Sequence, residues 1–456
     1  MAKRTGSSSY ICSVCGAMFS NWAGRCSMCG QWNTLELSIT TATASLSNPL
    51  ADAGLKSSNL AAAIQLEDQR LVTSIGGVDL VFGGGIVGGS VNLLSGEPGM
   101  GKSTLLLQLA AGVANHYPVI YVSGEESLHQ VGLRANRLGL VQSTNLKLAS
   151  SNSADAITSE ILKKKTKLVI VDSIQTLTCS DIGSSAGSVT QITNSSAMIT
   201  RAAKEANCAV IIVGHVTKEG NLAGPKLLEH IVDVVLSLEG DSSGGLRLLR
   251  VSKNRFGSVN ETAIFEMKDQ GLELVKNPSA VLLEERKNTD GSVVLAAIEG
   301  SRPILVEVQA LVNPTGYGYP KRAVSGFDLS RLNLLIAMIE RRTNLTLKDK
   351  DIFVNIVGGI KINEPAADLA VVMAIASAAR GKKLRLNAVV FGEIGLSGEI
   401  RHVPFIDKRV AEGLSLGFEA AIGPKPPLSN GKSNQTPLGL QPVTEVRSVL
   451  NEFLIK

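Results

Sequence analysis

The feature that most constrains this chain is a glycine-rich loop that directly follows an apolar stretch. Residues 91–96 have the apolar character of a buried strand, and Gly96 is followed, after four residues, by Gly101, Lys102 and Ser103. A leucine-rich helical pattern begins immediately afterwards. In such a loop the glycines let backbone N–H groups turn inward around a phosphate, while the lysine reaches the β- and γ-phosphates and the serine hydroxyl can bind Mg²⁺. The spacing therefore predicts a nucleotide-binding site.

A glycine-rich turn that matches this spacing by chance is the alternative, but the flanking strand and helix disfavour it. We expect the cofactors to be ATP and Mg²⁺. The residues predicted to hold them in this segment are Gly96, Glu97, Pro98, Gly99, Met100, Gly101, Lys102, Ser103 and Thr104.

Composition sets broad limits on the function. The 456 residues are enough for two or three domains, and 44% hydrophobic with 19% charged residues is ordinary for a globular protein. The net charge of +5 permits nucleic-acid binding without proving it. The longest apolar run, residues 369–379, is too short to span a bilayer, and the polar amino terminus lacks the features of a signal peptide. We therefore expect a cytoplasmic protein with no membrane partner.

Four of the six cysteines form two CxxC pairs, Cys12 with Cys15 and Cys26 with Cys29, separated by ten residues. Two such turns can present four thiolates in tetrahedral geometry, which suits Zn²⁺ in a closed structural site. Two disulfides are the alternative, but adjacent CxxC pairs form strained bridges and the chain otherwise resembles a cytosolic protein.

Both tryptophans, Trp22 and Trp32, lie in this cysteine-rich segment together with Phe19. In so small a module they are expected to form its core, with stacking on nucleic-acid bases as the alternative.

Acidic residues follow two further predicted strands. Glu125 lies just beyond the strand at residues 119–123, where a carboxylate could orient and deprotonate the attacking water. Asp172 ends the apolar strand at residues 168–172, as in a Walker B motif, and would hold Mg²⁺ through water. A solvated acidic turn is the alternative interpretation of Glu125. His215, after a fourth strand, is predicted to sense the γ-phosphate, although a lone histidine is more often structural.

The order of these motifs resembles the RecA-type recombinase core. In addition, Lys253-Asn254-Arg255-Phe256-Gly257 resembles the KNRFG signature of the RadA (Sms) family of bacterial DNA repair proteins. This resemblance implies that Lys253 and Arg255 act in trans on ATP bound by a neighbouring subunit of a ring. From the residues alone, a solvated basic turn is the alternative.

Two glycine-containing loops resemble the DNA-binding loops of RecA-like assemblies. They cover residues 181–191 and 215–226, and the second supplies Lys218 and Lys226 as expected phosphate contacts. Neither loop is rich in aromatic residues, which favours contact with the DNA backbone over base stacking.

The C-terminal third resembles the Lon protease domain, whose motif places a catalytic serine directly after a proline. Here Pro365 is followed by Ala366, so no acyl-enzyme can form. Lys408 is the nearest candidate for the partner lysine, and it has no hydroxyl to activate. The paired basic residues Lys321-Arg322 and Lys382-Lys383 are candidate DNA contacts, with solvated basic turns as the alternative.

The expected fold is α/β, with a RecA-like P-loop ATPase core, a small N-terminal zinc-binding module and a C-terminal α+β Lon-protease-like domain. We expect a zinc finger at residues 1–36, a linker at 37–65, the ATPase at 66–275 and the last domain at 276–456. The resemblance implies a homo-hexameric, DNA-dependent ATPase of recombination. Its partners would be single-stranded DNA, recombination intermediates and a RecA-type recombinase, and its activity would be branch migration. An ATP-driven switch and a Lon-type protease are the two alternatives.

Overall fold

The computed structural model forms two compact units, Met1–Glu67 and Asp68–Lys456. It describes residues 9–12, 18–19, 22–26, 28–32, 34–38, 70–215, 225–240, 246–316, 318–426, 428–429, 432–433 and 436–454.

The N-terminal unit is a small antiparallel sheet with the strand order β2-β1-β3. Its strands are β1 (Ser9–Cys12), β2 (Met18–Phe19) and β3 (Leu35–Ser38). Between β2 and β3 in the chain, a turn is closed by the Cys26 amide, which donates to the carbonyl oxygen of Gln31, and by the Gly30 amide, which donates to that of Cys26.

The predicted aromatic core of this unit is wrong. The side chains of Trp22 and Trp32 are 59% and 69% exposed, whereas Cys26 is buried with Phe19 and Cys29 packed against it. A module of this size has too little volume to enclose two indole rings, so its small core gathers around cysteine instead. The Trp32 ring instead lies 5.7 Å from the guanidinium carbon of Arg25.

The larger unit contains a nine-stranded sheet with the order β14-β13-β12-β11-β6-β10-β9-β7-β8. The six strands from β11 to β8 are parallel and the other three are antiparallel. The strands are β6 (Val91–Gly96), β7 (Val119–Ser123), β8 (Leu146–Ser150), β9 (Leu168–Asp172), β10 (Ala209–His215), β11 (Val234–Gly240), β12 (Leu246–Asn254), β13 (Thr262–Lys268) and β14 (Gly271–Leu274). The central strands are buried on both faces because their sequences are continuous apolar runs.

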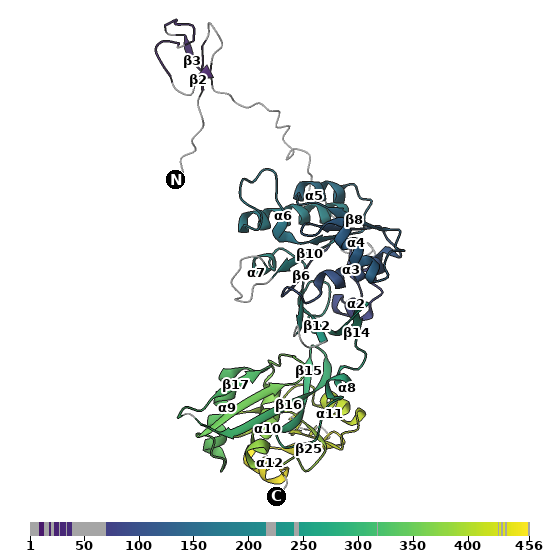
Figure 1. Ribbon diagram of the computed structural model, residues 1–456, viewed down its shortest axis with the longest axis vertical. Coiled ribbons are helices and arrows are strands. Elements are labelled where there is room, and N and C mark those ends of the chain that lie inside the picture. Colours follow the sequence, from purple (N-terminus) through teal and green to yellow (C-terminus); the bar gives the residue numbers. More distant parts are fainter. Residues whose placement is uncertain are drawn as a thin grey trace. The chain divides into compact units, whose positions relative to one another are not determined.

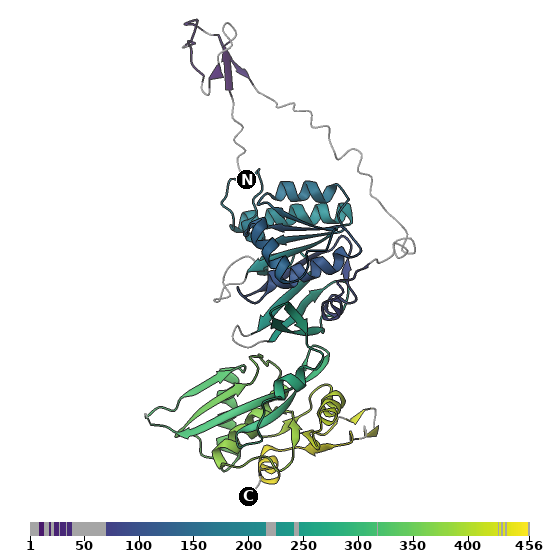
Figure 2. The ribbon, with the colours of Figure 1, turned by 45° about the vertical axis from the view of Figure 1, so that its right-hand side comes forward.

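Helices cover both faces of this sheet (Figures 1 and 2). One apolar core lies between the sheet and α2, α3 and α4, and a second lies between the sheet and α5 and α6. The bounds are α2 (Gly76–Phe82), α3 (Lys102–Ala114), α4 (Leu128–Arg137), α5 (Ala154–Leu162), α6 (Val189–Ala206) and α7 (Pro225–Leu228), with the 3₁₀ turn η1 (Ile174–Thr176) and the short strands β4 (Arg70–Leu71) and β5 (Ile86–Val87). This arrangement brings the carboxyl ends of the parallel strands to one edge, where α/β proteins bind ligands.

The C-terminal part has its own seven-stranded sheet, with the order β17-β18-β16-β15-β19-β22-β25. These strands are β15 (Ser292–Glu299), β16 (Arg302–Pro314), β17 (Arg322–Ser325), β18 (Lys350–Ile356), β19 (Ala388–Val390), β22 (Ala420–Pro424) and β25 (Leu440–Val443). Two short hairpins pair β20 (Glu393–Ile394) with β21 (Ile400–Arg401) and β23 (Leu428–Ser429) with β24 (Lys432–Ser433).

The helices of this part are α8 (Pro278–Leu283), α9 (Leu329–Arg342), α10 (Asp368–Arg380), α11 (Ile406–Ser415) and α12 (Val446–Glu452). Helix α10 is apolar around most of its circumference and is buried over its first ten residues, so it forms the centre of this core. The turn η2 (Pro365–Ala367) leads into it and has proline in its first position, as the sequence predicted. In the part of the chain that the structure describes, no helix meets the length and hydropathy needed to cross a membrane.

Candidate functional site

The predicted phosphate-binding loop lies between the carboxyl end of β6 and the amino end of α3. Gly96 and Gly101 adopt φ angles of 153° and 95°, respectively, which favour glycine. A Cβ atom on Gly96 would lie 2.5 Å from the carbonyl oxygen of Leu238, so a larger residue would distort the loop. The backbone thus has the turn that a phosphate cradle requires.

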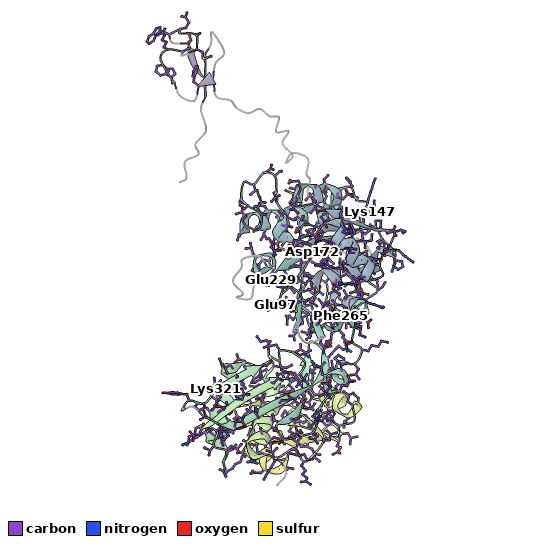
Figure 3. The ribbon with its side chains drawn as sticks, viewed as in Figure 1. Glu97, Lys147, Asp172, Glu229, Phe265 and Lys321 are labelled. Atoms are coloured by element: carbon purple, nitrogen blue, oxygen red, sulfur yellow. The ribbon has the colours of Figure 1, made fainter. Side chains whose placement is uncertain are left out.

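Lys102 is buried in this loop, with only 4% of its surface exposed. Its ammonium donates to the carbonyl oxygens of Gly96 and Glu97, each at 2.8 Å. Burial lowers its pKa, while the carboxylates of Asp172 and Glu125 act to raise it. The lysine therefore lies in the electrostatic field of Asp172 and Glu125, the two acidic residues that the sequence singled out. Figure 3 labels Asp172.

Asp172 ends β9, two strands away from β6 in the sheet. One of its carboxylate oxygens accepts a hydrogen bond of 2.5 Å from the phenol of Tyr121 on the neighbouring strand β7. Ser103 follows Lys102 in the first turn of α3, at the amino end of the helix. A hydroxyl and a carboxylate are oxygen ligands of the kind that Mg²⁺ prefers, so these residues fit the predicted metal site.

The two consecutive glutamates after β7 have different partners. Glu125 accepts a hydrogen bond of 2.5 Å from the hydroxyl of Ser173, which follows Asp172. Glu126 forms a bidentate pair with Arg134 of α4, with distances of 2.6 and 2.8 Å. The structure therefore holds Glu125 beside the Walker B strand and directs Glu126 to the arginine.

A cavity of about 710 Å³ opens beside the loop. It is lined by residues of the loop, of α4 and of the β13–β14 hairpin, among them Pro98, Gly99, Gly101, Lys102, Ser103, Thr104, Arg134, Arg137, Met267, Lys268, Asp269 and Gly271. Four of these residues are cations, which suits a polyphosphate ligand. Sequence reasoning missed Arg134 and Arg137 because nothing in the local pattern separates them from ordinary solvent-exposed helix residues.

The predicted sensor His215 pairs in the sheet with Gly96, so its backbone lies at the start of the phosphate-binding loop. Its side chain, like that of Lys226 in α7, is outside the described residues, and so is Lys218. The roles assigned to these three residues stay predictions.

Lys253 and Arg255 lie at the other end of the sheet from the phosphate-binding loop. Arg255 is 2.9 Å from one carboxylate oxygen of Asp233, whose other oxygen accepts from the amide of Val91. Val91 begins β6 and Gly96 ends it, a span of roughly 16 Å at about 3.3 Å per residue. The predicted in-trans residues thus lie far from the nucleotide site of their own chain.

An ion pair lies close in sequence to Ala366, the position where the Lon resemblance would place a serine. Ala366 is buried, and Glu364, two residues earlier, forms a bidentate pair with the fully buried Arg409, at 2.6 and 3.0 Å. Lys408 points elsewhere, because its ammonium donates to the carbonyl oxygen of Ser301. Arg409 is thus paired with Glu364, whereas Lys408, the candidate partner lysine of a Lon-type site, is bonded to Ser301.

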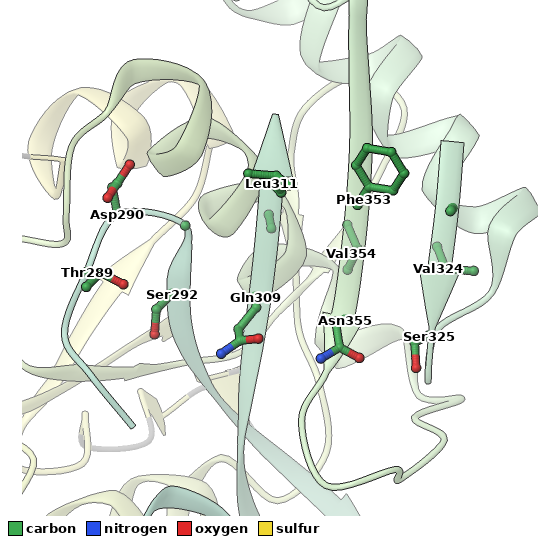
Figure 4. Close-up of a pocket in the computed structure, with 13 residues that line it drawn as sticks. Thr289, Asp290, Ser292, Gln309, Leu311, Val324, Ser325, Phe353, Val354 and Asn355 are labelled. Carbon is green, nitrogen blue, oxygen red and sulfur yellow. The ribbon is translucent and has the colours of Figure 1, made fainter. Parts of the chain in front are cut away.

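A second cavity, of about 500 Å³, lies on the C-terminal sheet across β15 to β17 (Figure 4). Its lining is mostly neutral, with polar groups from Ser292, Gln309 and Asn355 and one acid, Asp290. No lysine or arginine lines it within the described residues, so it does not match a DNA backbone.

The four candidate basic residues lie outside this cavity. Arg322 donates to the carbonyl oxygens of Leu347 and Lys350, and burial lowers its pKa. Its guanidinium is therefore engaged with the backbone of its own domain. Lys321 and Lys383 are exposed and Lys382 is half-buried. Their contact with DNA stays a prediction.

The predicted zinc ligands are only partly within the described residues. Cys26 and Cys29 are described, Cys12 is described in its backbone alone, and Cys15 falls outside. The Cys26 to Gln31 turn places the second CxxC pair on one tight loop. Thiolate donors in such a loop suit a structural zinc ion.

Comparison with known proteins extends these observations over almost the whole chain. Residues 57–221 match a family described as AAA domain, and residues 10–36 match the rubredoxin metal binding domain. The DNA repair protein RadA of Pseudomonas aeruginosa is 45% identical over 96% of both chains. The RadA proteins of Aquifex aeolicus and Escherichia coli are 45% and 44% identical over 91% of this chain and 93% and 92% of theirs.

The AAA match, the metal-binding match and the parallel strand order confirm an α/β fold with a RecA-like P-loop ATPase core and an N-terminal zinc ribbon. The Lon-like character of the C-terminal part and the bounds of the four predicted segments stay predictions.

Proposed function

This chain belongs to the family of the DNA repair protein RadA, and on that basis we propose that it is a DNA-dependent ATPase of homologous recombination and recombinational DNA repair. The match to an AAA domain supports ATP hydrolysis by this protein, and we assign that reaction to the site described above. In our proposal it forms a homo-hexameric ring that moves along single-stranded DNA in the cytoplasm. It drives branch migration of recombination intermediates alongside a RecA-type recombinase.

The observation that carries this proposal is the position of Lys253 and Arg255. Arg255 is tied to Asp233 at the amino end of β6, roughly 16 Å from the last residue of that strand. Such residues cannot reach ATP held by their own loop without refolding the sheet. They can act only on ATP of an adjacent subunit, which requires a head-to-tail assembly such as a closed ring.

Residues of one chain would perform the remaining steps. Lys102 leaves the carbonyl oxygens of Gly96 and Glu97 and binds the β- and γ-phosphates. Ser103 and Asp172 would hold Mg²⁺, which would supply positive charge to neutralise that of the phosphates. Glu125, oriented by the hydroxyl of Ser173, directs the attacking water and accepts its proton.

DNA would lie along the loops at residues 181–191 and 215–226. Lys218 and Lys226 would contact phosphates, which predicts affinity that falls as salt rises. His215 would pass the state of the nucleotide to the second loop, because its backbone is paired with Gly96 at the start of the phosphate-binding loop.

Two alternatives make different predictions. A RecA-like signalling switch would hydrolyse ATP at a rate indifferent to DNA. A Lon-type protease would need a nucleophile where Ala366 stands and a titratable lysine where the buried pair of Arg409 and Glu364 lies. The second alternative is therefore disfavoured by two separate features of the same site.

The test is complementation between two inactive variants. Lys102→Ala removes the loop lysine and retains the in-trans residues, whereas Lys253→Ala does the reverse. Each variant alone is expected to be inactive. A 1:1 mixture should recover about a quarter of wild-type hydrolysis, because about a quarter of randomly formed interfaces then pair two intact halves.

A mixture that co-assembles but stays inactive would contradict in-trans catalysis. Co-assembly is checked by pulling down an affinity-tagged Lys102→Ala chain and measuring the untagged Lys253→Ala chain that accompanies it. The double variant Lys102→Ala/Lys253→Ala, mixed with wild-type chain at the same ratio, controls for nonspecific stabilisation by inactive subunits.

A further inference from the structure

Tyr121 lies behind the proposed magnesium site and has a side chain of the right length to reach it. In the pairing of β7 with β9, Ser123 lies opposite Asp172 and Tyr121 lies opposite Ile170. Tyr121 and Asp172 therefore point to the same face of the sheet and are offset by two residues, about 6.6 Å along the strand. A phenol spans this offset, whereas a serine or threonine at position 121 would be too short.

The phenol is fully enclosed and has a specific partner. Tyr121 is 1% exposed, and its hydroxyl lies 2.5 Å from a carboxylate oxygen of Asp172. A carboxylate oxygen only accepts, so the phenol is the donor in this bond. A buried hydroxyl needs such a partner, and here the partner is the Walker B carboxylate itself.

We propose that Tyr121 is a positioning residue that orients Asp172 for magnesium. Tyr121 donates a hydrogen bond to one carboxylate oxygen of Asp172. The second carboxylate oxygen is then left to face the metal and its water. The inference rests on the proposed ATPase chemistry and adds a residue that never touches ATP.

The consequence is a change in magnesium affinity that leaves nucleotide contacts intact. Partners that orient metal ligands typically contribute 10- to 100-fold to metal affinity. Tyr121→Phe keeps the ring and removes the hydroxyl, so the ring's packing against the α3 side of the sheet is retained. We expect the variant to need at least tenfold more Mg²⁺ for tight nucleotide binding.

The experiment measures binding of a fluorescent ADP analogue to the full chain over a magnesium titration, with a parallel series in EDTA. Tyr117→Phe is the matched control, because it removes a phenol hydroxyl from the same domain just before β7, at the strand end opposite Asp172. Thermal melting checks that each variant is folded. Tyr121→Met is a second apolar replacement and should show the same shift in magnesium requirement.

The inference is supported if both Tyr121 variants bind the analogue like wild type in EDTA but need at least tenfold more Mg²⁺. It is overturned if the magnesium requirement is unchanged. It is also overturned if affinity falls equally with and without the metal, because Tyr121 would then act only through packing. If wild-type protein binds the analogue equally well with and without magnesium, the proposed chemistry is overturned along with the inference. The wild-type series alone gives that result.

Discussion

The ammonium of Lys253 lies 2.6 Å from the backbone carbonyl oxygen of Glu229, in the segment that follows the second predicted DNA loop (Figure 3 labels Glu229). It also donates to the carbonyl oxygen of Val232 at 2.8 Å. A residue expected to act on a neighbouring ATP is thus bonded, within its own chain, to the segment after the loop expected to hold DNA. Movement of that segment would release or retain the lysine.

We expect Lys253→Ala to bind ATP nearly as well as wild type and to lose hydrolysis by roughly a thousandfold or more. The reason is that an in-trans cation stabilises charge in the transition state without holding the ground-state nucleotide. Equilibrium binding and turnover measured on the same preparation separate the two effects.

Lys147→Ala is the matched control for Lys253→Ala. Lys147 is an exposed lysine on β8, the strand at the opposite edge of the same sheet. This control should keep both binding and turnover. Lost nucleotide binding by Lys253→Ala in an intact oligomer would contradict the in-trans role.

Glu125→Gln should retain nucleotide binding and reduce hydrolysis by about 10² to 10⁴, the range expected when a general base is removed. Ser173→Ala should reduce turnover less, because the carboxylate stays in place but loses the hydrogen bond that orients it. Glu126→Gln serves as the comparison. A larger loss of turnover with Glu126→Gln than with Glu125→Gln would exchange the roles assigned to the two glutamates.

Ala366→Ser should not create a peptidase. Arg409 is tied to Glu364, two residues before the new hydroxyl, and cannot give up its proton near neutral pH. Lys408 is engaged with the carbonyl oxygen of Ser301. Hydrolysis of a fluorogenic peptide and of an unfolded protein, each with ATP, are the measurements. Serine-dependent cleavage by the variant, absent from wild type, would show that another base serves this site.

Glu299 should make folding stability depend on pH. Burial raises its pKa to about 7, from 4.5, despite the ion pair with Arg250 at 2.9 Å. Between these two values the folded chain binds more protons than the unfolded chain. The contribution of Glu299 to the free energy of unfolding is therefore fully present below about pH 4.5 and is lost as pH rises to about 7.

Glu299→Gln mimics the protonated acid, so it should match wild type near pH 5. At pH 8 it should be the more stable protein, by on the order of 1 to 3 kcal/mol. Urea denaturation at both pH values provides the comparison. A variant that is less stable than wild type at pH 8 would show that the ion pair with Arg250 outweighs the cost of burying the charge.

The local motifs were predictable because each is defined by residues that lie close together in the sequence. The phosphate-binding loop, Asp172 and Glu125 each follow a recognisable apolar strand, and the structure brings all three to one edge of the sheet. Tyr121 was missed because it reads as an ordinary buried strand residue. Its bond to Asp172 depends on the register between β7 and β9, which the local sequence does not specify.

In the C-terminal part, too, the local sequence does not specify which of two neighbouring side chains is buried. Lys408 and Arg409 are adjacent in sequence, but on α11 they point about 100° apart. Arg409 is buried against Glu364, while Lys408 reaches Ser301. The Lon resemblance pointed to the lysine, but the orientation of α11 places the arginine, and not the lysine, against Glu364.

The most direct test of the account is ATP hydrolysis with and without single-stranded DNA over a salt titration, with Lys102→Ala as the inactive control. The account predicts that DNA stimulates hydrolysis and that this stimulation fades as salt rises, because DNA is held through its phosphates. Hydrolysis that depends on Lys102 but is unchanged by DNA at every salt concentration would contradict the proposed motor. It would instead favour the ATP-driven switch.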